Sequence, residues 1–104
     1  MRLSTEQFIN RICEHQIPIY VKKLFLFGSE VYGCPNKNSD IDIAVISDSI
    51  LTISQRCELD ELIENSKPPY YCQLTYLDNT PYIGGFNVKM DVYSKGVLIY
   101  ERQP

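Results

Sequence analysis

The sequence predicts one domain of the α/β (α+β) class, in which a mixed β-sheet is flanked by helices. Three observations support this: the chain has 104 residues, helical and strand-like apolar patterns follow one another along it, and the first two strands are joined by a short link. A chain of this length can bury one modest core. Because repeats, low-complexity tracts and linkers are absent, we expect a single domain over residues 1–104.

The first half of the chain predicts one helix and two strands. Ser4 and Gln7 have the spacing of a capping box, and apolar residues at helical spacing predict a helix over about residues 5–16. Residues 19–27 are rich in β-branched and aromatic side chains, which predicts a strand, and residues 40–46 predict a second one. The link between them has twelve residues, the lower limit for a parallel crossover. We therefore expect a mixed sheet.

The second half of the chain predicts a further helix and two further strands. Apolar residues at helical spacing predict a helix over about residues 52–65, which a Lys-Pro-Pro sequence ends. Residues 70–77 predict a third strand and residues 97–100 a short final one. Between them we expect a turn at residues 78–81 and a short helix over about residues 86–94.

The composition indicates a soluble cytoplasmic protein. A net charge of −3 argues against nucleic acid as a direct partner. No apolar run reaches the length of a membrane span, so we expect no membrane partner. The four cysteines form no CxxC pair, which favours free thiols over a zinc site or disulfides. His15 falls near the predicted end of the first helix, where the helix dipole favours its charged form, and we expect no catalytic role for it.

Two short motifs, Gly28-Ser29 and Asp40-Ile41-Asp42, carry the chemistry. The two aspartates lie two apart on a predicted strand, so their carboxylates project from the same face, with Cα atoms about 6.6 Å apart. Adjacent carboxylates repel one another unless cations bridge them, and Mg²⁺ is the metal that suits oxygen ligands and phosphates. Gly28 lets the backbone approach a ligand, and a helix start at Ser29 would favour phosphate. Together the motifs predict metal-assisted phosphoryl or nucleotidyl transfer, although each alone could be a turn or a solvated strand face.

Gly28-Ser29, ten residues and then Asp40-x-Asp42 resemble the signature of the DNA polymerase β-like nucleotidyltransferase superfamily. The short chain, the helix before the first motif and the ending Ser94-Lys95-Gly96-Val97-Leu98-Ile99-Tyr100-Glu101 are similar to its minimal nucleotidyltransferase (MNT) branch. The resemblance covers nearly the whole chain and implies the polymerase β-like nucleotidyltransferase fold.

For this chain the resemblance implies Mg²⁺ as cofactor and ATP, or another nucleoside triphosphate, as substrate. It assigns Asp40 and Asp42 as catalytic metal ligands, and Gly28 and Ser29 as residues that bind the phosphates. It also implies a protein partner, a HEPN-type toxin, to which the domain acts as antitoxin and to which it transfers AMP.

The chain departs from this family at two positions. Active members use a third carboxylate on a later strand, where this chain has Gln73, and an amide is no general base and a poorer Mg²⁺ ligand. Asp78 is the nearest acid, beyond the expected strand end. Glu30 follows Gly-Ser, where the family often has a basic or small residue, and its charge would oppose a triphosphate unless it points away. Three readings remain: an active nucleotidyltransferase, an antitoxin that binds without chemistry, and a nucleotide-sensing regulatory module.

Six of the eight tyrosines fall in the C-terminal half. Because tyrosine is common in cores and interfaces, we expect them to pack there, with one of them as a candidate for stacking on the nucleotide base. They are Tyr70, Tyr71, Tyr76, Tyr82, Tyr93 and Tyr100.

Overall fold

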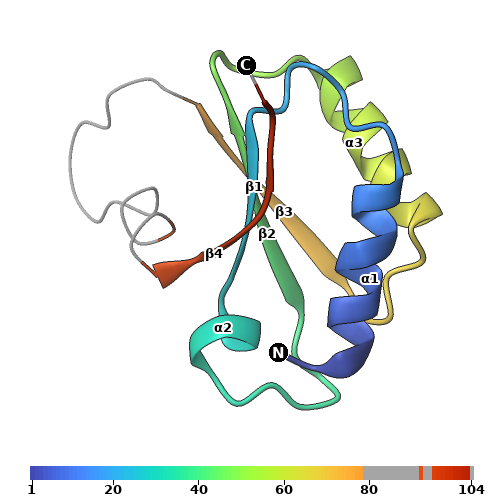
Figure 1. The fold of residues 1–104 in the computed structure, drawn as a ribbon, viewed down its shortest axis with the longest axis vertical. Helices are drawn as coiled ribbons and strands as arrows, with labels where there is room; N and C mark the ends of the chain where they lie inside the picture. Colours follow the sequence, from blue (N-terminus) through green and yellow to red (C-terminus); the bar gives the residue numbers. More distant parts are fainter. Residues whose placement is uncertain (79–91, 93–94, 104) are drawn as a thin grey trace.

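The described part of this computed structural model covers residues 1–78, 92 and 95–103. Its elements follow the order α1 (Leu3–Glu14), β1 (Lys23–Phe27), α2 (Ser29–Tyr32), β2 (Ile41–Ser47), α3 (Ile53–Asn65), β3 (Cys72–Asp78) and β4 (Val97–Glu101) (Figure 1). None of these helices combines the length and the apolar character that crossing a bilayer requires.

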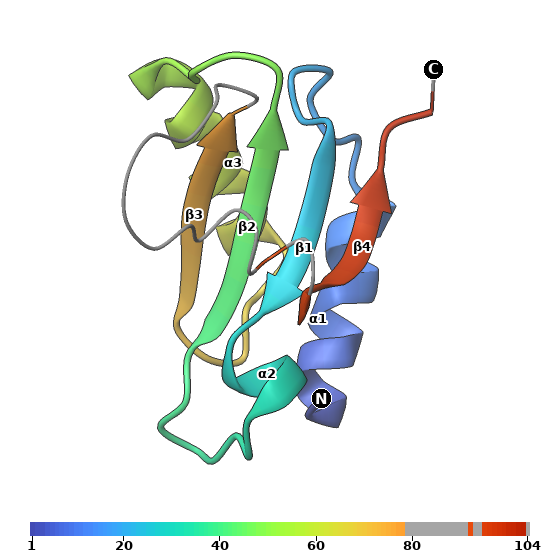
Figure 2. The same ribbon diagram turned by 90° about the vertical axis from the view of Figure 1, so that its left-hand side faces the viewer.

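The four strands form one sheet in the order β3-β2-β1-β4 (Figure 2). β1 runs antiparallel to both β2 and β4, whereas β2 and β3 are parallel. The parallel pair is possible because α3 supplies the crossover between its two strands. The predicted mixed sheet with helices, and the predicted pairing of the first two strands, are confirmed.

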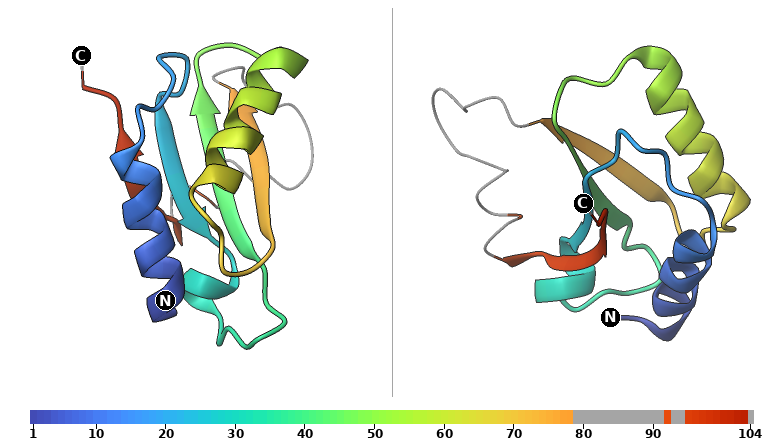
Figure 3. Two further views of the ribbon diagram at one scale, coloured as in Figure 1. Left: turned by 90° about the vertical axis from the view of Figure 1, so that its right-hand side faces the viewer. Right: turned by 45° about the horizontal axis from the view of Figure 1, so that its top comes forward.

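α1 and α3 both cover the same face of the sheet (Figure 3). β2 shows how the sequence makes this layer, because its residues alternate between two apolar clusters. Ile41, Ile43 and Val45 join the main core beneath the helices, and Ala44 and Ile46 join a smaller cluster on the opposite face with Phe25 and Val92. The main core consists of Phe8, Ile9, Ile12, Val21, Leu24, Leu26, Ile41, Ile43, Val45, Leu51, Leu59 and Ile63.

α1 spans Leu3–Glu14 rather than the predicted residues 5–16, and α3 begins at Ile53, one residue after the predicted start. The predicted capping box of Ser4 and Gln7 is wrong: α1 begins at Leu3, its N-cap is Arg2, and no side chain caps it. The Ser4 hydroxyl instead donates a hydrogen bond to the Tyr70 hydroxyl at 3.0 Å. The Ser4 hydroxyl thus makes a tertiary hydrogen bond instead of the helix-capping bond that the local sequence predicted.

β1, β2 and β3 begin one to four residues later than predicted, whereas β4 begins at Val97 as predicted. β1 starts at Lys23 rather than at residue 19, because residues 19 and 20 form a turn in which the Val21 N–H donates to the Pro18 carbonyl at 3.0 Å. β3 ends at Asp78, one residue beyond the prediction. The predicted helix over residues 86–94 and the turn at 78–81 lie largely outside the described residues.

The tyrosines divide between core and surface. Tyr70, Tyr76 and Tyr100 pack against the main core, which confirms the expectation for these three. Tyr71 is 70% exposed. Tyr82 and Tyr93 lie outside the described residues.

Candidate active site

The end of β1 touches the carboxylate of Asp42. Gly28, between β1 and α2, has φ +77° and ψ −150°, a conformation that L side chains rarely adopt. A Cβ atom on Gly28 would lie 2.4 Å from Oδ2 of Asp42. The glycine is therefore required twice, by its backbone conformation and by the carboxylate that lies against it.

Asp40 and Asp42 meet at the start of β2. Asp42 is half-buried, and Asp40, just before the strand, is exposed. Burial raises the pKa of Asp42, and the negative charge of Asp40 raises it further. A hard cation such as Mg²⁺ prefers oxygen ligands. Bound between the two carboxylates, it would offset both the burial of the Asp42 charge and its repulsion by Asp40.

Gln73 lies beside Asp42 on the neighbouring strand. The two residues are in register in the parallel β2–β3 pair, and adjacent strands are about 4.8 Å apart. Gln73 is exposed, and it shares the face of Asp42, since its neighbours Cys72 and Leu74 pack against the main core on the other face. The position that the sequence analysis assigned to the missing third carboxylate is therefore adjacent to the aspartates.

Two other groups on β3 are poor candidates for the missing base. Burial raises the pKa of the Cys72 thiol to about 12, with a contribution from the charge of Asp42, so this thiol stays protonated at neutral pH. Asp78 pairs with Ser47 at the opposite end of β3. Asp78 lies five positions after Gln73 along the extended strand, which places their backbones about 16 Å apart.

α2 is a single turn that begins at Ser29. The Gly28 carbonyl accepts hydrogen bonds from the N–H groups of Val31 at 3.0 Å and Tyr32 at 3.1 Å. The first N–H groups of a helix have no partner within it, so this turn can offer donors to an anion together with the half-buried Ser29.

Glu30 does not present its charge at this site. Its side chain is fully buried and forms an ion pair with the Arg2 guanidinium. The concern that this acid would repel a triphosphate is thus removed by a residue 28 positions away in the sequence.

Sequence reasoning missed Arg2 as a residue of this region. Only the structure shows that Glu30 is buried, and a buried acid needs a partner because an isolated buried charge is very costly. No local sequence pattern connects Arg2 with Glu30, so the sequence carried no signal for this pair.

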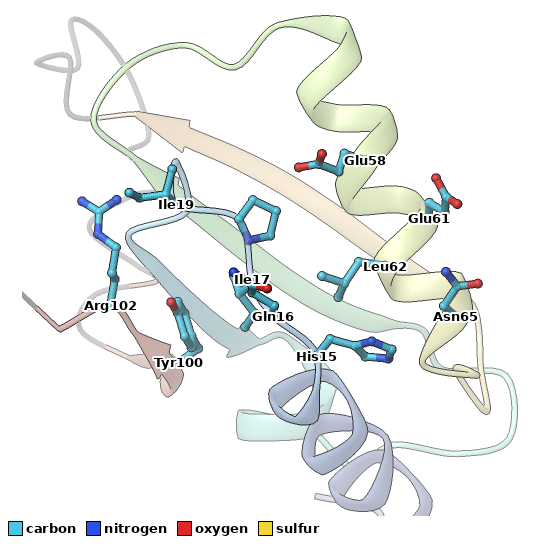
Figure 4. Close-up of a pocket in the computed structure, with 11 residues that line it drawn as sticks. His15, Gln16, Ile17, Ile19, Glu58, Glu61, Leu62, Asn65, Tyr100 and Arg102 are labelled. Carbon is cyan, nitrogen blue, oxygen red and sulfur yellow. The ribbon is translucent and has the colours of Figure 1, made fainter.

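A cavity of about 690 Å³ lies elsewhere, between the C-terminal end of α1, α3 and β4 (Figure 4). None of the four predicted site residues lines it, and Gln73 does not either. Its lining residues are His15, Gln16, Ile17, Pro18, Ile19, Glu58, Glu61, Leu62, Asn65, Tyr100 and Arg102. His15 thus lies at this cavity, at the C-cap of α1. Within the described residues no three His, Cys, Asp or Glu side chains are grouped as a metal site.

Comparison with solved structures identifies similar folds. A chain of a crystal structure of a toxin–antitoxin with AMP-PNP is 26% identical, with a TM-score of 0.65, and the match covers 94% of this chain and 74% of that one. A chain of the toxin–antitoxin MntA–HepT is 22% identical, with a TM-score of 0.57 and coverage of 98% and 74%. A chain of a tri-AMPylated Shewanella oneidensis HEPN toxin in complex with an MNT antitoxin is 24% identical, with a TM-score of 0.60 and coverage of 93% and 72%.

The sequence was also compared with curated proteins and with protein families. No curated protein matches the chain. The family described as "Polymerase beta, Nucleotidyltransferase" matches residues 7–104, nearly the whole sequence. The chain therefore belongs to the polymerase β nucleotidyltransferase family.

Proposed function

We propose that the chain is a Mg²⁺-dependent nucleotidyltransferase of the MNT type, which transfers AMP from ATP to a protein partner. The observation that carries this proposal is the contact of the Asp42 carboxylate with the Gly28 backbone, beside Asp40. A carboxylate pair and a helix start then lie together at one end of the sheet. This is the juxtaposition that holding a metal-bound triphosphate requires.

In this proposal each residue has a distinct role. Asp40 and Asp42 hold Mg²⁺, Gly28 leaves room for the phosphates, and Ser29 donates a hydrogen bond to them. Bound there, Mg²⁺ would neutralise the charge that develops on the phosphates. The acceptor hydroxyl forms a bond to the α-phosphorus while the bond from that phosphorus to pyrophosphate breaks, and the hydroxyl proton is released to solvent. Most of the rate comes from positioning these groups.

This reaction lacks a carboxylate base at position 73 that could accept the proton of the acceptor hydroxyl. Gln73, in register with Asp42, can donate or accept a hydrogen bond but cannot take up that proton. This observation favours a second candidate function, an MNT-fold antitoxin that binds its partner and Mg-ATP but transfers AMP slowly or not at all. A nucleotide-binding regulatory module is a variant of the same candidate.

The partner is inferred from the comparison. The solved structure with the toxin–antitoxin and AMP-PNP, at 26% identity, supports a toxin as partner and an adenine nucleotide as ligand. We infer a HEPN-type toxin, in agreement with the resemblance of the sequence to the MNT branch, and a cytoplasmic location.

The test measures AMP transfer to a HEPN protein encoded next to this chain, by mass after incubation with Mg-ATP. The unaltered chain should transfer slowly, whereas Gln73→Glu and Gln73→Asp should increase transfer because they restore both a ligand and a base. Asp40→Asn with Asp42→Asn should abolish transfer and Mg-ATP binding, and Gln73→Ala is the matched control. Rapid transfer that no Gln73 variant changes would place the third acid elsewhere. Unchanged Mg-ATP binding in the double Asn variant would refute the site.

A further inference from the structure

All three nitrogens of the Arg2 guanidinium have partners. Nε pairs with the buried Glu30 carboxylate, Nη1 donates to the Asn36 carbonyl at 2.6 Å, and Nη2 donates to the Ser39 carbonyl at 2.9 Å. The guanidinium carbon also lies 3.5 Å from the centre of the Tyr70 ring, within range of a cation–π contact. One side chain thus contacts three segments that are distant in the sequence.

Each of these segments leads directly to a residue of the candidate site. Glu30 follows Ser29 in α2. Ser39 precedes Asp40 at the end of the loop over residues 33–40, and Tyr70 lies three residues before Gln73. Figure 2 shows the start of α1, α2 and this loop at the same end of the sheet. The contacts of Arg2 therefore fix the relative positions of the segments that carry the phosphate-binding turn, the aspartates and Gln73.

The chemistry of these contacts requires a guanidinium. Its planar group offers five N–H donors in a fixed arrangement, whereas a lysine offers a single nitrogen. The loop before β2 also needs an external hold, because it contains no helix or strand. Its internal hydrogen bonds are short-range, such as Asn36 N–H to Ser39 Oγ at 3.0 Å.

We propose that Arg2 is a positioning residue for nucleotide binding, which holds α2 and the loop before β2 in the one arrangement that brings Ser29, Asp40 and Asp42 to the same ligand. This inference rests on the proposed function and adds to it a residue that does not touch the ligand. Removing Arg2 should weaken Mg-ATP binding even in variants whose fold is intact.

The chain supplies a matched control in Arg11, near the other end of α1. Its Nε donates to the Ser66 carbonyl at 2.8 Å and its Nη2 to the Lys67 carbonyl at 2.9 Å, so it joins α1 to the end of α3. Both arginines bind backbone carbonyls, but the partners of Arg11 lie farther from the site: Lys67 is six residues before Gln73, and neither partner adjoins Ser29 or the aspartates. Loss of Arg11 should lower stability without changing nucleotide affinity.

The experiment measures the Kd of Mg-ATP by calorimetry and the melting temperature for the full chain and five variants. These are Arg2→Gln, Arg2→Lys, Arg2→Gln with Glu30→Gln, Arg11→Gln, and Asp40→Asn with Asp42→Asn. The Arg2→Lys variant keeps a positive charge for Glu30, and the double Gln variant removes the buried charge, so both should stay folded even if Arg2→Gln does not. Both should nevertheless bind Mg-ATP about tenfold or more weakly, since a small displacement of positioned groups has a large effect.

A second readout separates positioning from general stability. Amide hydrogen exchange over residues 33–40 should accelerate in the double Gln variant and stay unchanged in Arg11→Gln. If the double Gln variant, folded at the assay temperature, binds Mg-ATP as tightly as the unaltered chain, Arg2 has no positioning role. An equal loss of affinity in Arg11→Gln would refute it too. If the unaltered chain itself does not bind Mg-ATP, both the proposed function and this inference fail. Calorimetry of the unaltered chain distinguishes this outcome from a failure of the inference alone.

Discussion

On the face covered by the helices, β2 buries Ile41, Ile43 and Val45 almost completely, whereas on its opposite face the same strand begins with the half-buried Asp42. The first face gains stability from apolar contacts with α1 and α3. The second face gives up part of that gain, because burial and Asp40 both disfavour the charge of Asp42. At the start of β2, side-chain alternation thus places a core residue and a site residue on opposite faces, although farther along the strand Ala44 and Ile46 are buried on the second face too. Variants of Ile43 and of Asp42 should therefore affect different measurements.

The largest expected change in stability comes from the helix-covered face. Ile43→Ala should lower the free energy of unfolding by about 2–5 kcal/mol, because Ile43 is 0% exposed in the main core and its loss leaves a cavity. Urea unfolding measures this change, and calorimetry at temperatures where the variant is folded should find normal Mg-ATP affinity. The control is Ile50→Ala, at a side chain 71% exposed, which should change stability by less than about 0.5 kcal/mol. Equal effects of the two changes would contradict the comparison.

A medium effect on both measurements is expected at Gly28, where fold and site meet. Gly28→Ala should lower the free energy of unfolding by about 1–3 kcal/mol and weaken Mg-ATP binding, because the new Cβ is strained at positive φ and displaces the Asp42 carboxylate. Repeating Gly28→Ala in an Asp42→Ala background removes the closest contact and leaves the backbone strain. The stability cost should therefore be smaller there, and additive costs would show that the carboxylate does not press on Gly28.

The smallest expected effect, of opposite sign, comes from Asp42→Asn. The pKa of Asp42 is raised in the folded chain, so the folded state binds this proton more tightly than the unfolded state does. Stability from this group is therefore full below the unfolded pKa of about 3.9 and is lost as the pH rises through the folded value. In the absence of Mg²⁺, Asp42→Asn should raise stability at pH 7 by a few tenths of a kcal/mol, about the size expected of a partly exposed group.

Melting curves in the presence of a chelator check this sign. The gain of Asp42→Asn over the unaltered chain should vanish as the pH is lowered toward about 3.5. Asp48→Asn is the control, since Asp48 is an exposed partner of Lys22 at 3.2 Å and its removal should not stabilise the chain. A loss of stability at pH 7 in Asp42→Asn would mean that the carboxylate has a favourable partner in the folded chain.

The sequence by itself determined the elements that depend on near neighbours. Periodic apolar residues predicted α1, α3 and the strands, because a helix face or a strand face can be recognised within one or two turns of chain. The same alternation predicted that Asp40 and Asp42 share a face. The glycine at position 28, directly after a strand, predicted that the backbone could approach a ligand closely. In the structure the group that lies against Gly28 is the Asp42 carboxylate.

Only the tertiary structure decided the relations between distant segments. The register that sets Gln73 beside Asp42 depends on how α3 returns the chain to the sheet, and the pairing of Arg2 with Glu30 joins positions 28 residues apart. The Ser4 hydroxyl likewise bonds Tyr70 rather than capping α1. Local propensity differs by only fractions of a kcal/mol between such options, so packing and buried charge, which involve the whole fold, decide among them.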